Sequence, residues 1–155
     1  MKIKALSVAL ILAAIPVCAN AQTGDAIAEL TTKSGKLGTA LPGKAMVVFY
    51  RPGSLMGMAM GCTIREGKDE AKFEIARLGS GKYWAHSAEP GKHDYRTEGE
   101  RSDLVSLNVE PGQTYFVKCV IGVGIAAGSA RIEASDAADF AKKSKGLTLW
   151  EPKAQ

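Results

Sequence analysis

Cysteine, histidine and long hydrophobic runs are all scarce in this 155-residue sequence. Three cysteines are too few for a disulfide-dense mini-protein, and two histidines give little material for a histidine-based site. The longest apolar stretches, residues 5–15 and 120–128, are shorter than the ~20 residues that a membrane-spanning helix needs. A composition of 46% hydrophobic and 23% charged residues is close to that of a folded globular domain and excludes general disorder.

Residues 1–21 have the pattern of a secretory signal peptide. Lys2 and Lys4 give the segment a positive start, and the small residues of Ala19-Asn20-Ala21 stand directly before Gln22. We predict cleavage between Ala21 and Gln22, which makes the mature chain an exported, periplasmic protein.

Cys18 leaves a second interpretation open, in which a lipid anchors the chain. Ile15 lies three positions before the cysteine, as an aliphatic residue does in lipoprotein signals. Those signals also have a small residue directly before the cysteine, however, and here that residue is Val17. We therefore favour a periplasmic chain without an anchor at Cys18.

The mature chain has nearly balanced charge. Without Lys2 and Lys4, 18 basic residues face 16 acidic ones, a net charge of +2. Nucleic-acid-binding domains carry a larger excess of basic residues. We therefore expect no nucleic-acid partner.

After residue 43 the sequence takes on the pattern of a β protein. Residues 45–50 are a continuous apolar run of strand length, and residues 72–78 alternate between apolar and polar side chains. Further strand patterns occupy residues 58–65, 82–87, 93–97, 104–109, 114–121 and 130–134. The many short strands predict a mainly β fold, an immunoglobulin-like antiparallel β-sandwich of seven to eight strands. The sequence Gly79-Ser80-Gly81 is expected to close a hairpin.

One short C-terminal helix is predicted after the last strand. Ser135 can cap its start and Gly146 can end it, and residues 147–150 then lie back on the core as an extended tail. The predicted organisation along the chain is a signal peptide at 1–21, a flexible leader at 22–43, the sandwich domain at 44–150 and a tail at 151–155.

Four Pro-Gly dipeptides predict type II turns, because proline presets φ at the second position and glycine accepts a positive φ at the third. The turns are Leu41-Pro42-Gly43-Lys44, Arg51-Pro52-Gly53-Ser54, Glu89-Pro90-Gly91-Lys92 and Glu110-Pro111-Gly112-Gln113. Tyr115 opens a strand just after Pro111-Gly112 and can hydrogen-bond back to the backbone of that corner, as in the tyrosine corner of immunoglobulin-like sandwiches.

Several of these motifs stand in a fixed order along the chain. They are Tyr50-Arg51-Pro52-Gly53-Ser54, a glycine-rich apolar stretch, Gly81-Lys82-Tyr83, Glu89-Pro90-Gly91-Lys92-His93 and Glu110-Pro111-Gly112-Gln113-Thr114-Tyr115. In this order they resemble a bacterial family of envelope lipoproteins known as domain of unknown function 2846. The resemblance covers about residues 44–140 and implies a small exported β-sandwich with no catalytic residues to transfer. Val17 departs from the lipoprotein pattern of that family.

Four sulfur-containing side chains recur at every second position and would share one face of a strand. They are Met56, Met58, Met60 and Cys62. Soft sulfur ligands in an exported protein suggest Cu(I), with His86 or His93 completing the site. The interpretation that we favour is that the methionines fill a face of the core, a use that their flexible side chains suit.

No catalytic constellation is evident. His93 and Asp94 are neighbours on a strand and would point to opposite faces, and His86 is expected to be a half-exposed strand residue. The sequence Gly79-Ser80-Gly81 lacks the strand-to-helix setting of a nucleophile elbow, and residues 122–128 lack the lysine of a phosphate-binding loop. We expect neither an enzyme nor a cofactor.

Two apolar, glycine-rich segments, residues 54–61 and 122–128, are the remaining candidates for function. They can be bulged strand ends where backbones approach closely, or an apolar edge or groove that receives a protein segment, a glycan or a lipid chain. The sequence thus favours a non-catalytic binding or structural module of the cell envelope, with an unknown envelope protein, glycan or lipid as partner. The alternative is a Cu(I)-binding protein.

Cys62 and Cys119 are predicted to form a disulfide. Loss of Cys18 with the signal leaves these two, an even number in an oxidising compartment. Strand alternation points both side chains inward, so they could meet across the core.

Overall fold

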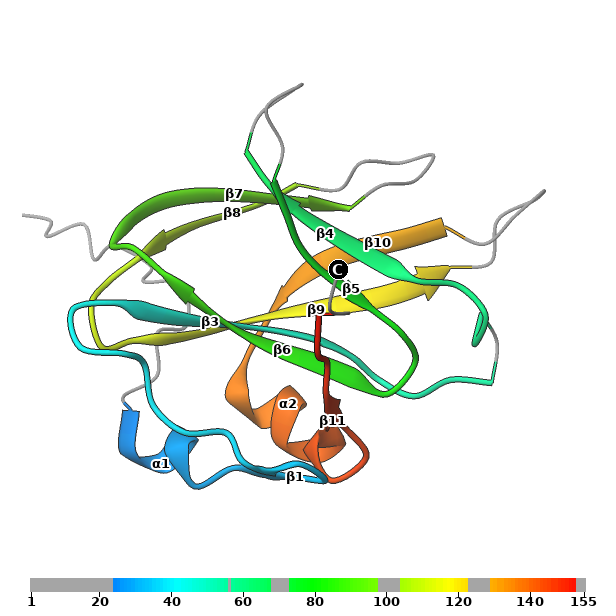
Figure 1. The fold of residues 1–155 in the computed structure, drawn as a ribbon, viewed down its shortest axis with the longest axis horizontal. Helices are drawn as coiled ribbons and strands as arrows, with labels where there is room; N and C mark the ends of the chain where they lie inside the picture. Colours follow the sequence, from blue (N-terminus) through cyan, green and yellow to red (C-terminus); the bar gives the residue numbers. More distant parts are fainter. Residues whose placement is uncertain (1–23, 56, 68–72, 98–103, 123–128, 153–155) are drawn as a thin grey trace, which may run out of the picture.

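The computed structural model describes residues 24–152 except for 56, 68–72, 98–103 and 123–128. The predicted mainly β fold is confirmed, because two sheets pack face to face as a sandwich (Figure 1). Eight strands of five or more residues form the sandwich, four in each sheet, in agreement with the predicted seven to eight.

One sheet has the strand order β10-β9-β3-β6-β11. Its strands are β3 (Ala45–Arg51), β6 (Lys82–Ala88), β9 (Thr114–Gly122), β10 (Ser129–Ser135) and the short β11 (Thr148–Leu149). Every residue of β3 is buried, as expected of a central strand. Most pairs are antiparallel, but β3 pairs in parallel with β9 and β11 pairs in parallel with β6, so the sheet is mixed.

The other sheet has the order β5-β4-β7-β8 and is entirely antiparallel. Its strands are β4 (Cys62–Glu66), β5 (Phe73–Leu78), β7 (Gly91–Thr97) and β8 (Leu104–Val109). The predicted hairpin at Gly79-Ser80-Gly81 is wrong, because β5 and β6 belong to different sheets. A glycine turn of this kind serves equally well to carry the chain from one sheet to the other, which alternation along each strand cannot reveal.

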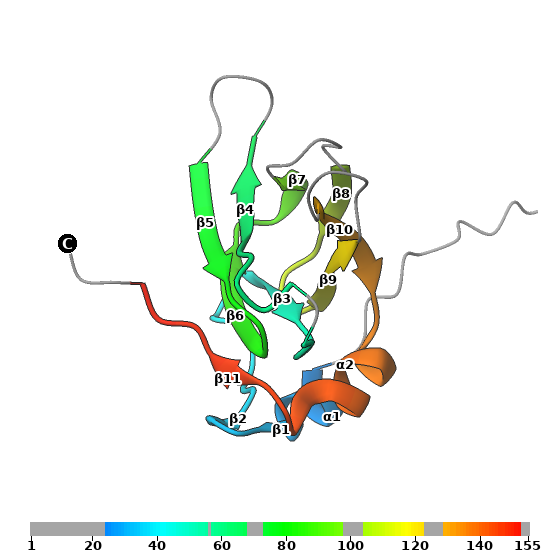
Figure 2. The same ribbon diagram turned by 90° about the vertical axis from the view of Figure 1, so that its right-hand side faces the viewer.

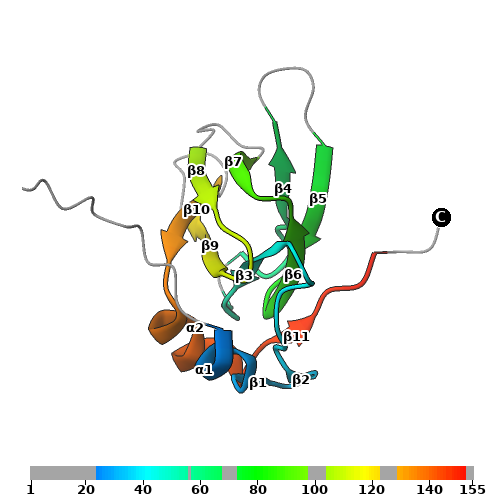
Figure 3. The same cartoon turned by 90° about the vertical axis from the view of Figure 1, so that its left-hand side faces the viewer.

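A third layer covers the outer face of the five-stranded sheet (Figures 2 and 3). It consists of α1 (Gly24–Ala28), β1 (Thr31–Thr32), β2 (Gly35–Lys36) and α2 (Ala137–Ser144). The prediction of a flexible leader is therefore wrong for residues 24–43. Ile27 is only 2% exposed and packs in one cluster with Met46, Val48 and Phe140. The outward side chains of β3 are apolar, and the leader is ordered because it covers them.

Helix α2 begins one residue later than predicted. Asp136 is its N-cap and accepts a hydrogen bond from the Asp139 N–H at 2.8 Å, whereas Ser135 is the last residue of β10. The predicted return of the tail is confirmed, since Trp150 packs edge-on against Trp84 with ring centroids 5.4 Å apart. Within the described part of the chain, no helix is long and apolar enough to span a membrane.

Two of the predicted type II turns are confirmed by hydrogen bonds and backbone angles. The Lys44 N–H donates to the Leu41 carbonyl at 3.0 Å with φ of +76° at Gly43, and the second turn has φ of +74° at Gly112. In that second turn the Gln113 N–H donates to the Glu110 carbonyl at 3.2 Å.

The tyrosine corner is also present, because the Glu110 N–H donates to the Tyr115 hydroxyl at 3.1 Å. Gly91 has a positive φ of 131°, whereas the turn predicted at Gly53 is wrong, since this glycine has no positive φ. Here the chain leaves β3 for the other sheet instead of reversing.

The predicted disulfide between Cys62 and Cys119 is present. It joins the first residue of β4 to β9, and the two Cα atoms are 6.6 Å apart. Both cysteines are buried among the inward side chains of the two sheets. The bridge therefore links the sheets across the core, and closing a loop of 57 residues restricts the unfolded chain by roughly 4 kcal/mol.

Candidate functional site

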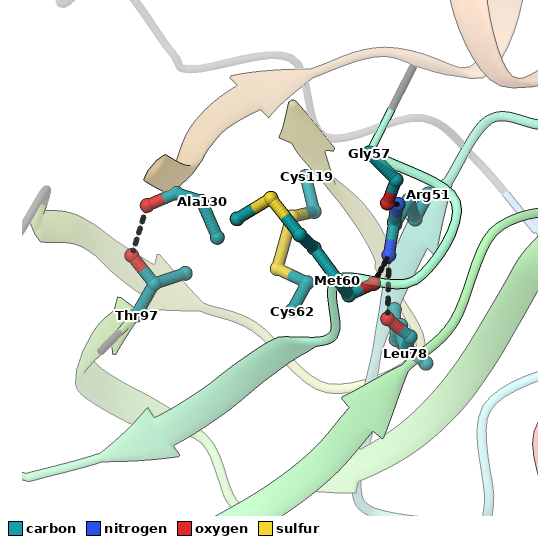
Figure 4. The surroundings of a disulfide bond; sticks show 8 residues. All are labelled: Arg51, Gly57, Met60, Cys62, Leu78, Thr97, Cys119 and Ala130. Carbon is teal, nitrogen blue, oxygen red and sulfur yellow. Dashed lines mark hydrogen bonds between the residues drawn. A yellow bond between two sulfur atoms is a disulfide. The ribbon is translucent and has the colours of Figure 1, made fainter. Parts of the chain in front are cut away.

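The connection between β3 and β4, residues 54–61, is held by a buried arginine (Figure 4). Arg51 is only 1% exposed. It is the last residue of β3 and lies near the disulfide (Figure 4). Its Nη2 donates to the Gly57 carbonyl at 2.6 Å. Its Nη1 donates to the Met60 carbonyl, and also to the Leu78 carbonyl, from which it lies 3.3 Å away. Burial lowers the pKa of Arg51, but a guanidinium stays protonated in proteins. One cation thus fixes the backbone of this connection, which we call the 54–61 loop.

The 54–61 loop also packs tightly on β9. Gly57 has φ of +72°, and a Cβ on it would lie 2.7 Å from Cγ2 of Ile121. A side chain at this position would have to displace Ile121, so glycine is required for the close approach. The 54–61 loop therefore lies against Ile121 near the end of β9, one residue before the second segment that the sequence singled out. Residues 123–128 lie outside the described part.

Two large apolar side chains of the 54–61 loop face outward. Leu55 is 91% exposed and Met58 is 63% exposed. Residues 55–60 contain no polar or charged side chain. Surface connections are usually polar, and a run of exposed apolar residues is unfavourable unless it serves function. The loop is therefore a candidate recognition surface.

A hollow of about 260 Å³ lies beside the 54–61 loop. Its lining residues are Arg51, Pro52, Ser54, Lys118, Cys119, Val120, Ile121 and Lys143. The hollow opens where β3 departs from β9, beyond the last pair of their ladder, Tyr50 and Lys118. Apolar and cationic side chains thus share this end of the sandwich.

A polar network surrounds Lys118, one of the residues that line the hollow. The Tyr50 hydroxyl donates to Asp139 at 2.7 Å and contacts the Ser135 hydroxyl at 2.6 Å. Lys118 forms ion pairs with Asp139 at 3.0 Å and Glu133 at 3.4 Å. Asp139 raises the pKa of Lys118, and the Tyr50 hydroxyl and Lys118 lower the pKa of Asp139. Burial raises the pKa of Tyr50. The charge of Lys118 is therefore neutralised within the fold.

The prediction of a methionine-bearing strand is wrong. Residues 57–59 form a turn, and the Met60 N–H donates to the Gly57 carbonyl at 2.9 Å, so β4 begins only at Cys62. Met58 is exposed, Met60 is half-buried and Met56 lies outside the described part. The three methionines therefore do not share a strand face, which removes the geometric basis of the Cu(I) site. The glycines at 57 and 61 were the sequence signal for a turn.

Both histidines instead converge on Glu66, a residue for which the sequence predicts no role. His93 Nδ1 is hydrogen-bonded to Glu66 Oε1, and His86 Nε2 lies 3.9 Å from Glu66 Oε2. His93 Nε2 also lies 2.7 Å from the Glu89 carbonyl. Glu66 and His93 belong to the four-stranded sheet and His86 to the five-stranded sheet, so the cluster links the two sheets. Because the three residues are far apart in the sequence, local patterns do not predict this contact.

The surroundings of this cluster oppose charge on His86. Burial lowers its pKa, Glu66 raises it and His93 lowers it further. Tyr95 stacks on His93 with centroids 5.9 Å apart, and its buried hydroxyl has no hydrogen-bond partner among the described residues. In the part of the chain that the structure describes, no group of three histidine, cysteine or carboxylate side chains could hold a metal ion. As predicted, Asp94 faces away from His93, and it accepts a hydrogen bond from Ser106.

Comparisons with family models, curated proteins and solved structures found no match for this chain. The resemblance to domain of unknown function 2846 therefore stays a prediction from its motifs. The predicted cleavage between Ala21 and Gln22 and the possible lipid site at Cys18 lie outside the described residues.

Proposed function

We propose that this protein is an exported β-sandwich module without catalytic activity, which binds a component of the cell envelope through the 54–61 loop. The observation that carries the proposal is an apolar loop that is exposed and yet fixed in place. Leu55 and Met58 point to solvent, while Arg51 and Gly57 hold the backbone beneath them. A surface that is already ordered loses little conformational entropy on binding, which favours recognition.

The disulfide supports the exported location. Disulfides persist in oxidising compartments such as the periplasm and are rare in the bacterial cytosol. A buried bridge between Cys62 and Cys119 agrees with the signal peptide predicted at residues 1–21. Mass spectrometry of the mature chain should find Gln22 as its first residue and no acyl group from Cys18.

Site-specific photo-crosslinking in living cells tests the binding surface. A photoreactive residue in place of Leu55 should give a discrete adduct with an envelope component. The matched control is Leu41, an apolar residue that is 59% exposed. It precedes β3, whereas the 54–61 loop follows β3, so the two positions lie at opposite ends of the strand. The adduct should be absent from position 41 and should disappear when Met58→Ser is added.

Two results would contradict the proposal. Identical adducts from both positions, or none from position 55, would show that the 54–61 loop is not the binding surface. A hydrolytic activity that is lost in His86→Gln or His93→Gln would contradict the absence of catalysis.

A further inference from the structure

We infer that the component bound by the 54–61 loop is an anionic phospholipid surface, an inference that rests on the function proposed above. The loop end of the sandwich combines apolar side chains at its tip with cations around them. This is the pattern by which peripheral proteins insert apolar groups below the headgroups while basic groups contact lipid phosphates.

The apolar component is small and protruding. Leu55 is 91% exposed, and the loop backbone is held at the Gly57 and Met60 carbonyls, so its tip cannot fold back onto the core. Val120 and Ile121 line the neighbouring hollow. A flat protein partner needs a large complementary area, whereas a bilayer accepts a few protruding side chains on their own.

Three cations flank the 54–61 loop. Arg77 lies beside Gly61, because its Nε is 3.0 Å from the position of a Cβ on that glycine. Lys143 lines the hollow, and Lys82 follows the turn whose Ser80 hydroxyl accepts a hydrogen bond from the Ser54 N–H at 3.0 Å.

These cations are available to a ligand. Among the described residues, no ion pair neutralises Arg77, Lys82 or Lys143, in contrast to Lys118, which is paired with Glu133 and Asp139. Unpaired cations around an apolar tip favour an anionic lipid surface over a neutral one. Each such charge contributes about a five-fold gain in partitioning to an anionic surface.

Vesicle co-sedimentation tests the inference. The mature chain, produced from Gln22 onward so that it lacks Cys18 and carries no acyl chain, is mixed with vesicles of phosphatidylcholine alone or with an equal part of phosphatidylglycerol. We expect binding to the mixed vesicles at least about ten-fold stronger than to neutral ones, and a loss of this difference at high salt.

Two pairs of variants separate the apolar and the cationic contributions. Leu55→Ser with Met58→Ser should weaken binding to mixed vesicles by about ten-fold, whereas Leu41→Ser should not. Lys82→Gln with Lys143→Gln should weaken it by about ten-fold or more, whereas Lys92→Gln, at the far end of the sandwich, should not.

The outcomes distinguish this inference from the proposed function. Absence of binding to mixed vesicles would overturn the lipid inference. Binding that is retained by both the apolar and the cationic double variant would overturn it as well. If position 55 nevertheless crosslinks to an envelope protein or glycan, the proposed function stands with a different partner. If position 55 gives no adduct in cells and no vesicle binding occurs, both fail.

Discussion

Arg51 and Gly57 fix the 54–61 loop by different means at the scale of single residues. The arginine supplies donors to two carbonyls of the loop and to one at the end of β5, and the glycine permits a backbone approach that no side chain allows. Arg51 is the last residue of β3, and Gly57 lies in the connection that follows. Substitution of either residue therefore tests the rigidity of the proposed binding surface separately.

Gly57→Ala should destabilise the fold more than Gly43→Ala. Both glycines have a positive φ, +72° and +76°, so both alanines are strained by about 1 kcal/mol. Only at Gly57 does the new Cβ meet Ile121, which adds about 1–3 kcal/mol of overpacking, because nothing lies within 4 Å at Gly43. Urea unfolding measures the difference, and equal losses would show that the close contact does not matter.

Arg51→Met should lower the free energy of unfolding by about 3 kcal/mol or more, because the carbonyls of Gly57, Met60 and Leu78 lose their shared donor. Arg51→Lys should recover only part of this loss, since one ammonium cannot replace a planar fork of donors. Urea midpoints with and without the variants provide the measurement. A lysine variant as stable as the wild type would mean that charge alone, and not the fork, holds the loop.

The strands and their connections show how far the sequence predicts this fold. Alternation correctly identified the inward cysteines and most strands, although β4 begins only at Cys62, and turn chemistry correctly identified the tyrosine corner at Tyr115. Local patterns failed at two of the places where the chain changes sheets. After Arg51 and after Leu78 the same Pro-Gly and Gly-Ser-Gly signals that make hairpins carry the chain across the sandwich.

Other features of the site depend on contacts between distant strands, which no local pattern reports. Glu66, His86 and His93 come from three strands in two sheets and meet only in the folded chain. Order in the leader likewise depends on the apolar outer face of β3, to which Ile27 packs.

The cluster between β4, β6 and β7 should make stability depend on pH. Burial holds the pKa of His86 below the value of about 6.5 expected in the unfolded chain. Above about pH 6.5 the residue is neutral in both states, and below it the unfolded chain takes up a proton that the folded chain resists. Stability due to neutral His86 is therefore lost as the pH falls through that range.

Comparison of the wild type with His86→Gln isolates this effect. Urea midpoints at about pH 7.5 and about pH 5 should show a larger loss on acidification in the wild type than in the variant. Glu66, His93 and Tyr95 remain in both proteins, so their contributions largely cancel. An equal loss in the two proteins would contradict a His86 held neutral by burial.

The whole molecule is a sandwich with different surroundings on its two faces and ends. One outer face is covered by α1, α2 and the leader, and one end carries the 54–61 loop (Figure 1). The disulfide and Arg51 both lie beneath that loop. A rigid base under an exposed apolar tip is the central feature of the proposed function.

Hydrogen–deuterium exchange with and without a solubilised envelope extract tests this claim most directly. We expect added extract to protect backbone amides in residues 54–61 and at the end of β9, and to leave residues 37–41 at the other end unchanged. The Leu55→Ser, Met58→Ser protein should show no such protection. Protection of residues 37–41, with residues 54–61 unaffected, would show that the 54–61 loop is not the binding surface.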